Sequence, residues 1–405
     1  MTDFSDEIDE DTLSGPDRRQ AHRDWIDFLF PELLEPISFG RADNKSYSVE
    51  QIIGLAAAAA NGNGLDSAAR MLPWYYKESE IPSSDNVKAL FDSQDRNDIE
   101  DTFAEVNKRF IDIAKDFGFF TDPHYYAYDP TLVGWEEGDF VHWDMDEGAP
   151  DADEDDEEGE DEEEAEDDEE DESENPWNFA VASVVNLEAR FCFGVNYIEG
   201  KKQESEKILG LMRNIAEEVD VGLLLADRGF HGGDAVRKAS AVAGEKYMIR
   251  AKKIGKVGEL LEETPVGESD FERNIDFSDV TPGPNAAAVP TKPWDKYSDP
   301  HIGLLIGFDP EDSPIDLYDA YGMRRAIEDT IRRLKSEFGI KSKHREIPIQ
   351  LYLFNLSNLF YNIWVLMNRA PGPETVVPLD VAYDEALRAI TDYAFTPDRS
   401  LRGFE

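Results

Sequence analysis

The sequence is poor in several residue types, and each shortage excludes a class of protein. A single cysteine, Cys192, among 405 residues excludes an internal disulfide and a metal site built from cysteine alone. Phenylalanines flank Cys192 on both sides, which predicts a buried structural thiol. Uninterrupted apolar runs are also missing. The longest apolar segment, 347–367, contains four amides and a serine, so we expect a buried helix there and no membrane span.

Positive charge is scarce as well. The 40 Lys and Arg face 89 Asp and Glu, which gives a net charge of −49. Residues 144–175 hold 23 of the acids and no Lys or Arg, but the rest of the chain still has 66 acids against 40 basic residues. An acidic surface of this kind predicts a protein that stays hydrated in strong salt, from a salt-loving archaeon. The acidic start, 1–17, has no apolar run, so we expect no signal peptide and a cytoplasmic location.

Composition and periodicity divide the chain into segments. The segments are an acidic disordered tail (1–17), a helical N-terminal domain (18–118), an α/β core (119–251) with a disordered acidic insert (144–175), a β-rich insertion (252–310), the rest of the core with one long helix (311–370), and a polar C-terminal tail (371–405). In the N-terminal domain the turn Asn61–Gly64 separates two helices, which leaves open a DNA-contacting helix–turn–helix or a plain helical bundle.

The core segment carries strand signals that end at carboxylates. Between 124 and 251 we expect strand, strand, strand, helix, strand, helix, strand, an order that fits a mixed sheet flanked by helices. Val221–Ala226 is a continuous apolar run, typical of a strand buried on both faces, and Asp227 ends it. Asp129 ends the first strand in the same way. Strand ends hold ligands in position, so both aspartates are candidate metal ligands.

A third carboxylate lies in the long helix expected at 313–338. Tyr321, Arg324, Glu328 and Lys335 follow one another at steps of three, four and seven residues, which places them within about 60° of one another around a helix. One carboxylate beside two cationic side chains and a phenol is a suitable set of residues for binding a metal ion that in turn coordinates a phosphate. The alternative is a solvated helix face held by Glu–Arg pairs.

The pattern Tyr-x2-Arg-x3-Glu-x6-Lys resembles the signature of a large subgroup of DDE transposases from insertion sequences. Asp227-Arg228-Gly229-Phe230 resembles the segment around that family's second catalytic aspartate, and Asp129-Pro130-Thr131 resembles the first. Asp122 and Asp139 are alternatives for the first position.

The resemblance implies an RNase H-like fold and two-metal chemistry. Asp129, Asp227 and Glu328 would hold two Mg²⁺ or Mn²⁺ ions, which would serve cleavage of double-stranded DNA at the element ends and strand transfer to target DNA. Synapsis of two DNA ends makes a homodimer plausible. Three other functions stay open: a non-transposing RNase H-like nuclease, a transposase-derived DNA-binding protein without catalysis, and an acidic protein that sequesters cations.

The same resemblance implies DNA contacts along the long helix. Arg324 would form a forked contact with a phosphate, Lys335 would supply a point charge, and Tyr321 would stack on a base or bind a phosphate. Residues 321–345 contain eight Arg or Lys against three acids, so the surrounding surface is locally basic. The candidate DNA-binding residues are Tyr321, Arg324, Lys335, Arg325, Arg332, Lys252 and Lys253.

Overall fold

The fold is known from a computed structural model. It describes residues 15–39, 47–133, 177–199, 203–278, 280–292, 299–310, 315–342, 344–373 and 378–396. The predicted acidic insert 144–175, most of the predicted N-terminal tail and Asp139 therefore lie outside the described residues.

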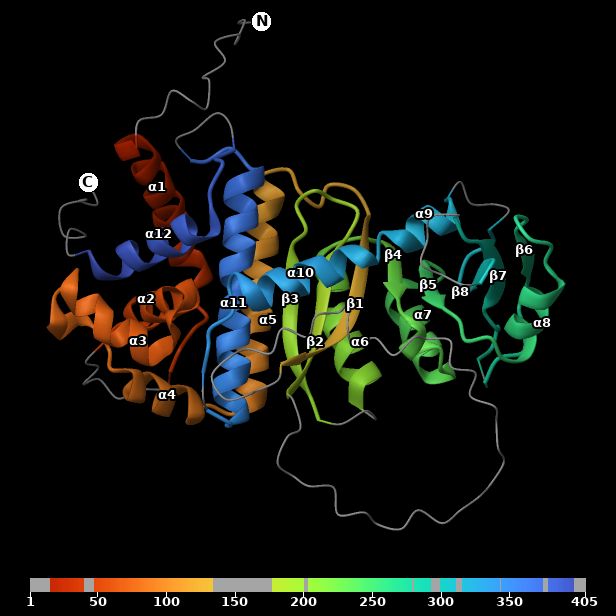
Figure 1. Cartoon of the computed structure of the whole chain (residues 1–405), viewed down its shortest axis with the longest axis horizontal. Helices are drawn as coiled ribbons and strands as arrows, with labels where there is room; N and C mark the ends of the chain where they lie inside the picture. Colours follow the sequence, from red (N-terminus) through yellow and green to blue (C-terminus); the bar gives the residue numbers. More distant parts are fainter. Residues whose placement is uncertain are drawn as a thin grey trace, which may run out of the picture.

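The strands form one mixed sheet. In chain order they are β1 (His124–Val133), β2 (Trp177–Val184), β3 (Cys192–Ile198), β4 (Val221–Ala226), β5 (Tyr247–Arg250), β6 (Asp270–Glu272), β7 (Asn285–Pro290) and β8 (His301–Ile306). Their order across the sheet is β3-β2-β1-β4-β5-β8-β7-β6 (Figure 1). β1, β4 and β5 are parallel, and the remaining neighbours are antiparallel. The segment 252–310 thus extends the core sheet through β8 and does not form a sheet of its own.

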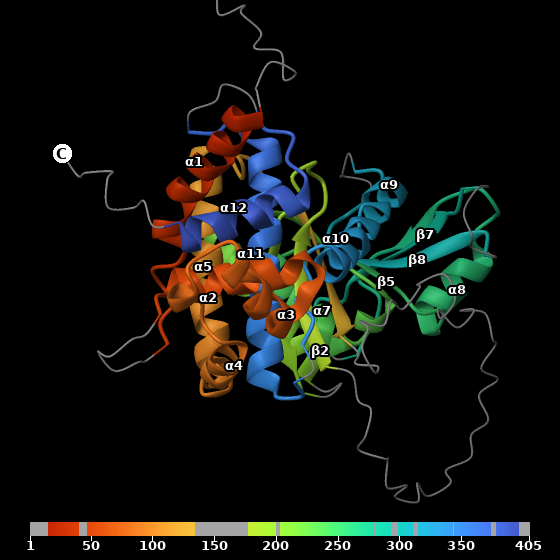
Figure 2. The same cartoon turned by 60° about the vertical axis from the view of Figure 1, so that its left-hand side comes forward.

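Helices flank the sheet and build a separate block beside it. In chain order they are α1 (Gly15–Leu33), α2 (Val49–Ala58), α3 (Gly64–Met71), α4 (Ser84–Asp92), α5 (Arg96–Asp116), α6 (Glu204–Glu218), α7 (Gly233–Ala243), α8 (Gly255–Glu263), α9 (Leu317–Gly322), α10 (Arg325–Ser336), α11 (Ile347–Arg369) and α12 (Tyr383–Phe395). The helices α1–α5 and α12 form a helical block. This block and the β7–β8 part lie at opposite ends of the molecule (Figure 2). The prediction of a mixed α/β sheet flanked by helices is confirmed.

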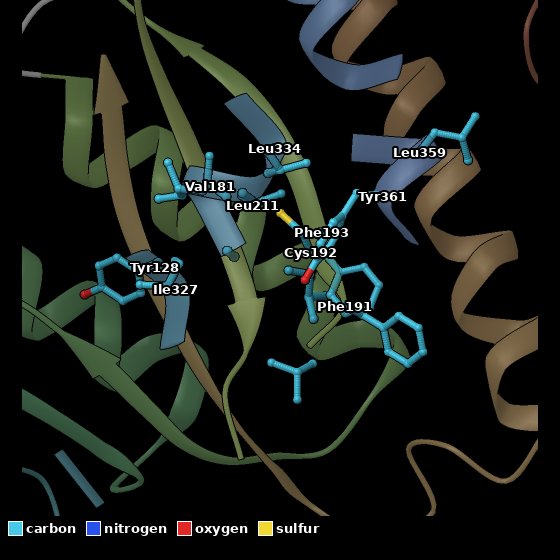
Figure 3. Packing of buried hydrophobic residues seen from close by; sticks show 14 of the residues in the cluster. Tyr128, Val181, Phe191, Cys192, Phe193, Leu211, Ile327, Leu334, Leu359 and Tyr361 are labelled. Atoms are coloured by element: carbon cyan, nitrogen blue, oxygen red, sulfur yellow. The ribbon is translucent and has the colours of Figure 1, made fainter. Parts of the chain in front are cut away.

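The order of the core elements is also as expected. β1, β2, β3, α6, β4, α7 and β5 follow one another along the chain. α6 and α7 pack on each other and on the sheet, while α10 lies across β1 and β2. The apolar stripe of α10 is buried: Ile327 and Leu334 are fully enclosed and belong to the same cluster of buried side chains as Tyr128 of β1 and Val181 of β2 (Figure 3). This packing determines where the polar edge of α10 meets the sheet.

Helix α11 joins the helical block to the sheet. It contacts α4, α5 and α12 on one side and β3 on the other. Its Asn362 accepts a hydrogen bond from the backbone nitrogen of Cys192 at 2.8 Å and donates one to the Cys192 carbonyl at 2.6 Å. The amide therefore satisfies the outer edge of β3 as a neighbouring strand would. Asn362, one of the amides that argued against a membrane span, thus has a structural role, and no helix of the described residues is long and apolar enough to cross a membrane.

Three predicted features differ from the structure. β1 does not end at Asp129 but continues to Val133, because β2 pairs with it along this stretch. The polar tail 371–405 contains the helix α12, which packs on α1 and α2. The expected single helix 313–338 is divided into α9 and α10, since the backbone nitrogens of Arg324, Ala326 and Ile327 bond to carbonyls three residues back.

Candidate functional site

The register of the sheet places two aspartates side by side. β1 and β4 run parallel, and Ala127 pairs with Leu225 in the last recorded step of their register. Asp129 lies two residues further along β1, and Asp227 lies two residues after Leu225, immediately past the end of β4. Both aspartates therefore lie toward the carboxyl ends of these neighbouring strands. Asp122 precedes β1 at its opposite end, so it does not reach Asp227. Of the described candidates for the first carboxylate, Asp129 therefore has the suitable position.

Arg324 links the third carboxylate to this pair. It lies at the junction of α9 and α10, where its Nη1 donates to Asp129 Oδ2 at 3.3 Å. Its Nη2 donates to Glu328 Oε1 at 2.6 Å, one turn further along the helix. The side chains of Arg324 and Asp129 are only 15% and 18% exposed, so the contact between them is largely shielded from water. The guanidinium thus bridges a strand and a helix that are 195 residues apart in the chain.

The three carboxylates are close enough for their charges to affect one another's protonation. Burial raises the pKa of Asp129 to about 7; Arg324 opposes this rise, and the negative charges of Asp227 and Glu328 add to it. Burial also acts to lower the pKa of Arg324, but Tyr321 and the three carboxylates outweigh it, so the pKa of Arg324 lies above its usual value. Carboxylates that raise one another's pKa in this way favour a nearby cation.

The donor set fits a hard divalent cation. Asp129, Asp227 and Glu328 offer carboxylate oxygens, the ligands that Mg²⁺ and Mn²⁺ prefer. No three acidic, histidine or cysteine side chains among the described residues converge in a ready-made metal group. The Arg324 guanidinium instead lies between the oxygens of Asp129 and Glu328. Cation binding at this place requires Arg324 to move.

Two further residues of the helix pattern lie close to this centre. Burial lowers the pKa of Lys335 to about 8, against the opposing charge of Asp129. Tyr321 is 7% exposed and its charge interaction with Arg324 places it beside the guanidinium. Stacking of Tyr321 on a base would require the ring to leave this position. Asp227 also has a local role, since its Oδ1 accepts a hydrogen bond from the backbone nitrogen of Gly229 at 2.8 Å.

The remaining predicted DNA-binding residues lie outside the carboxylate centre. Arg325 and Arg332 are exposed on α10, and Arg332 pairs with Asp329 at 3.1 Å. Lys252 and Lys253 are exposed between β5 and α8, and Lys253 forms an ion pair with Asp299.

A cavity of about 500 Å³ lies next to the Asp227 turn. Gly229, His231, Lys252, Lys256 and Phe277 are among its lining residues. His231 Nδ1 accepts a hydrogen bond from the backbone nitrogen of Lys252 at 3.1 Å, and burial lowers the pKa of this histidine to about 4. His231 carries no spacing signal in the sequence, because it is a lone histidine that follows a turn.

The helix pair α2–α3 is the part of the helical block for which the sequence leaves DNA contact open. α2 and α3 form the expected helix pair around the Asn61–Gly62 turn, with the capping box at Ser48 present. Lys88 is 7% exposed and binds Asp66 at 2.6 Å. No family model and no curated protein matches this chain, so the functional argument depends on the geometry of the site.

Proposed function

We propose that this protein is a DDE transposase of the insertion-sequence type, which cleaves DNA at element ends and transfers the strand to target DNA. The observation that carries the proposal is the bridge from Arg324 to Asp129 and Glu328. It connects the arginine and glutamate of the helix pattern to Asp129, a candidate for the first carboxylate that comes from a distant part of the chain. A solvated helix face held by local Glu–Arg pairs would not need the second contact.

The sheet supports an RNase H-like catalytic core. The strand order β3-β2-β1-β4-β5, with β1, β4 and β5 parallel and β2 antiparallel, is the arrangement that such a core requires. In this proposal Asp129 and Asp227 come from neighbouring strands and Glu328 from the helix lying across them. The β6–β8 extension and α8 stand where the family carries its insertion.

The roles of the side chains follow from their charge and position. Asp129, Asp227 and Glu328 would hold two divalent cations, which when bound activate the attacking oxygen and stabilise the leaving one. Arg324 would form a forked contact with a DNA phosphate, and Lys335 would place a point charge about three turns further along the helix. The exposed cations Arg325, Arg332, Lys252 and Lys253 would hold DNA on either side of the centre.

Strand cleavage in high KCl tests the proposal. The substrate is the DNA that flanks the gene in its own genome, with Mg²⁺ or Mn²⁺ added. We expect metal-dependent cuts at the element boundaries. Glu328→Gln should abolish cleavage and leave DNA binding within about twofold, because it removes one ligand oxygen and little volume.

The other outcomes assign other functions. Cleavage without regard to sequence indicates a non-transposing nuclease. End-specific binding without any cleavage indicates a DNA-binding protein derived from a transposase. Loss of binding together with cleavage in Glu328→Gln contradicts the proposed division between cation-holding and DNA-holding residues.

A further inference from the structure

The Arg324 guanidinium binds the carboxylate oxygens that a metal ion would need as ligands. It donates to Asp129 Oδ2 through one terminal nitrogen and to Glu328 Oε1 through the other. Each contact thus uses a different arm of the fork, and the positive charge lies between the two carboxylates. A divalent cation bound by the same residues would compete for these same oxygens and for the same negative field.

The guanidinium is held more firmly than a surface arginine. Its side chain is 15% exposed, and the partner carboxylates of Asp129 and Glu328 are 18% and 34% exposed. Another Arg–Glu pair on the same helix, Arg333 with Glu337, is 3.5 Å long with the arginine 41% exposed. Ion pairs at exposed positions contribute little, whereas the shielded Arg324 contacts hold a charge where water screens poorly.

We propose that Arg324 is an internal counter-ion that keeps the cation site closed in the DNA-free protein, and that a DNA phosphate opens the site by taking over the guanidinium. This inference rests on the proposed function, since it requires DNA and a divalent cation at one centre. A phosphate accepts the same forked contact that the two carboxylates accept now. Metal and DNA then bind cooperatively, and each raises the affinity for the other by the same factor.

The physical reason for such a device lies in the composition of the chain. With 89 acids in 405 residues, the protein offers many carboxylates to any divalent cation. A centre of three carboxylates that stayed open would load metal, and thus become competent for cleavage, without DNA. The counter-ion restricts loading to the DNA-bound state.

Equilibrium binding of Mn²⁺ to the full chain tests the inference without reference to catalysis. Free Mn²⁺ is followed by electron paramagnetic resonance in molar KCl, for the wild type, Arg324→Gln, Arg324→Gln with Glu328→Gln, and Arg333→Gln. The matched control Arg333→Gln removes an equal charge from an i,i+4 pair on the same helix. Acidic surface residues contribute the same background to all four proteins.

We expect Arg324→Gln to bind one Mn²⁺ about tenfold more tightly than the wild type, since a cation at contact distance from two carboxylates has been removed. The double variant should lose this gain, and Arg333→Gln should match the wild type. Equal Mn²⁺ affinity in Arg324→Gln and the wild type overturns the inference. If Arg324→Gln does not fold, Arg324→Lys replaces it. Lysine has one donor group in place of the forked guanidinium, so the Arg324→Lys variant should bind Mn²⁺ with an affinity between those expected for the wild type and for Arg324→Gln.

A second arm adds duplex DNA from the flanking sequence, with Ca²⁺-free buffer and Mn²⁺ as the probe. DNA should raise the Mn²⁺ affinity of the wild type and leave that of Arg324→Gln unchanged. Bound DNA that leaves wild-type Mn²⁺ affinity unchanged overturns the coupling. If both Mn²⁺ experiments give the expected result but no strand cleavage is seen, the counter-ion role of Arg324 is supported and the transposase activity is contradicted. Failure of the inference and failure of the proposed function are therefore distinguishable.

Discussion

At the residue scale, the carboxylate centre combines what spacing predicts with what only three dimensions reveal. Asp227 and Glu328 follow from a buried strand and a helical pattern, because both signals are local. The contact between Arg324 and Asp129 spans 195 residues, and no local pattern specifies it. The helix period places Arg324 and Glu328 on one face, and their contact is the Glu–Arg pairing of the alternative interpretation, while the burial that raises the pKa of Asp129 depends on tertiary packing.

His231 provides a prediction at the same scale. Its pKa is lowered from 6.5 to about 4 by burial, with Lys252 adding to the effect. As the pH falls, the unfolded chain takes up this proton before the folded chain does, so stability is lost between about pH 6.5 and pH 4. We expect the free energy of unfolding to fall by up to about 2 kcal/mol more in the wild type than in His231→Gln between pH 7.5 and pH 5.

Urea unfolding at constant KCl measures this difference. Both proteins share every other titrating group, so the gap between their pH profiles isolates His231. Parallel profiles for the two proteins would show that the histidine is free to protonate in the folded state.

At the element scale, the main surprise is the C-terminal helix α12. The segment 371–405, predicted as a polar tail, opens with a Pro- and Gly-rich stretch, but 383–395 carries apolar residues at helical spacing, among them Leu387, Ile390 and Ala394. The structure packs α12 on α1 and α2, where Ala386, Leu387 and Ile390 are buried. The local pattern therefore indicates the helix, whereas its partner surface lies more than 300 residues earlier and no local pattern specifies it.

Gly54 tests the packing of α12. A Cβ at Gly54, inside α2, would collide with Ala394 of α12, whereas a Cβ at Gly210, inside α6, meets nothing within 4 Å. We expect Gly54→Ala to destabilise the protein by about 1–3 kcal/mol through overpacking. Gly210→Ala should stabilise it by up to about 1 kcal/mol, because alanine favours a helix interior over glycine.

Thermal unfolding of the two variants provides the comparison. Each replaces a mid-helix glycine by alanine, so helix propensity changes equally in both. A melting temperature raised as much by Gly54→Ala as by Gly210→Ala contradicts the close packing of α12 on α2.

At the scale of the whole molecule, charge governs stability. A net charge of −49 repels itself when salt is dilute, since the screening length grows from about 3 Å in molar salt to about 10 Å at 0.1 M. Deleting 148–172 removes 19 acids and no basic residue, which reduces the net charge to −30. We expect the wild type to lose more thermal stability than the deletion variant when KCl is lowered from molar concentration to 0.1 M.

Calorimetry across a KCl series measures the two slopes, and cleavage in molar KCl serves as the functional control. The deletion should leave that cleavage nearly intact. Equal slopes would show that the charge of 148–172 does not act on the folded part, and a folded but inactive variant would show that the segment has a role in the reaction.

The central proposal is that Asp129, Asp227 and Glu328 form a single cation-dependent centre. The most direct measurement is cleavage of the flanking DNA by Asp129→Asn, Asp227→Asn and Glu328→Gln, beside Asp329→Asn as the control. Asp329 is the next carboxylate on α10 and pairs with Arg190 and Arg332 instead. The account predicts loss of cleavage, by about a thousandfold or more, in each of the three and near wild-type cleavage in the control. Full cleavage by any of the three, or equal loss in Asp329→Asn, would contradict it.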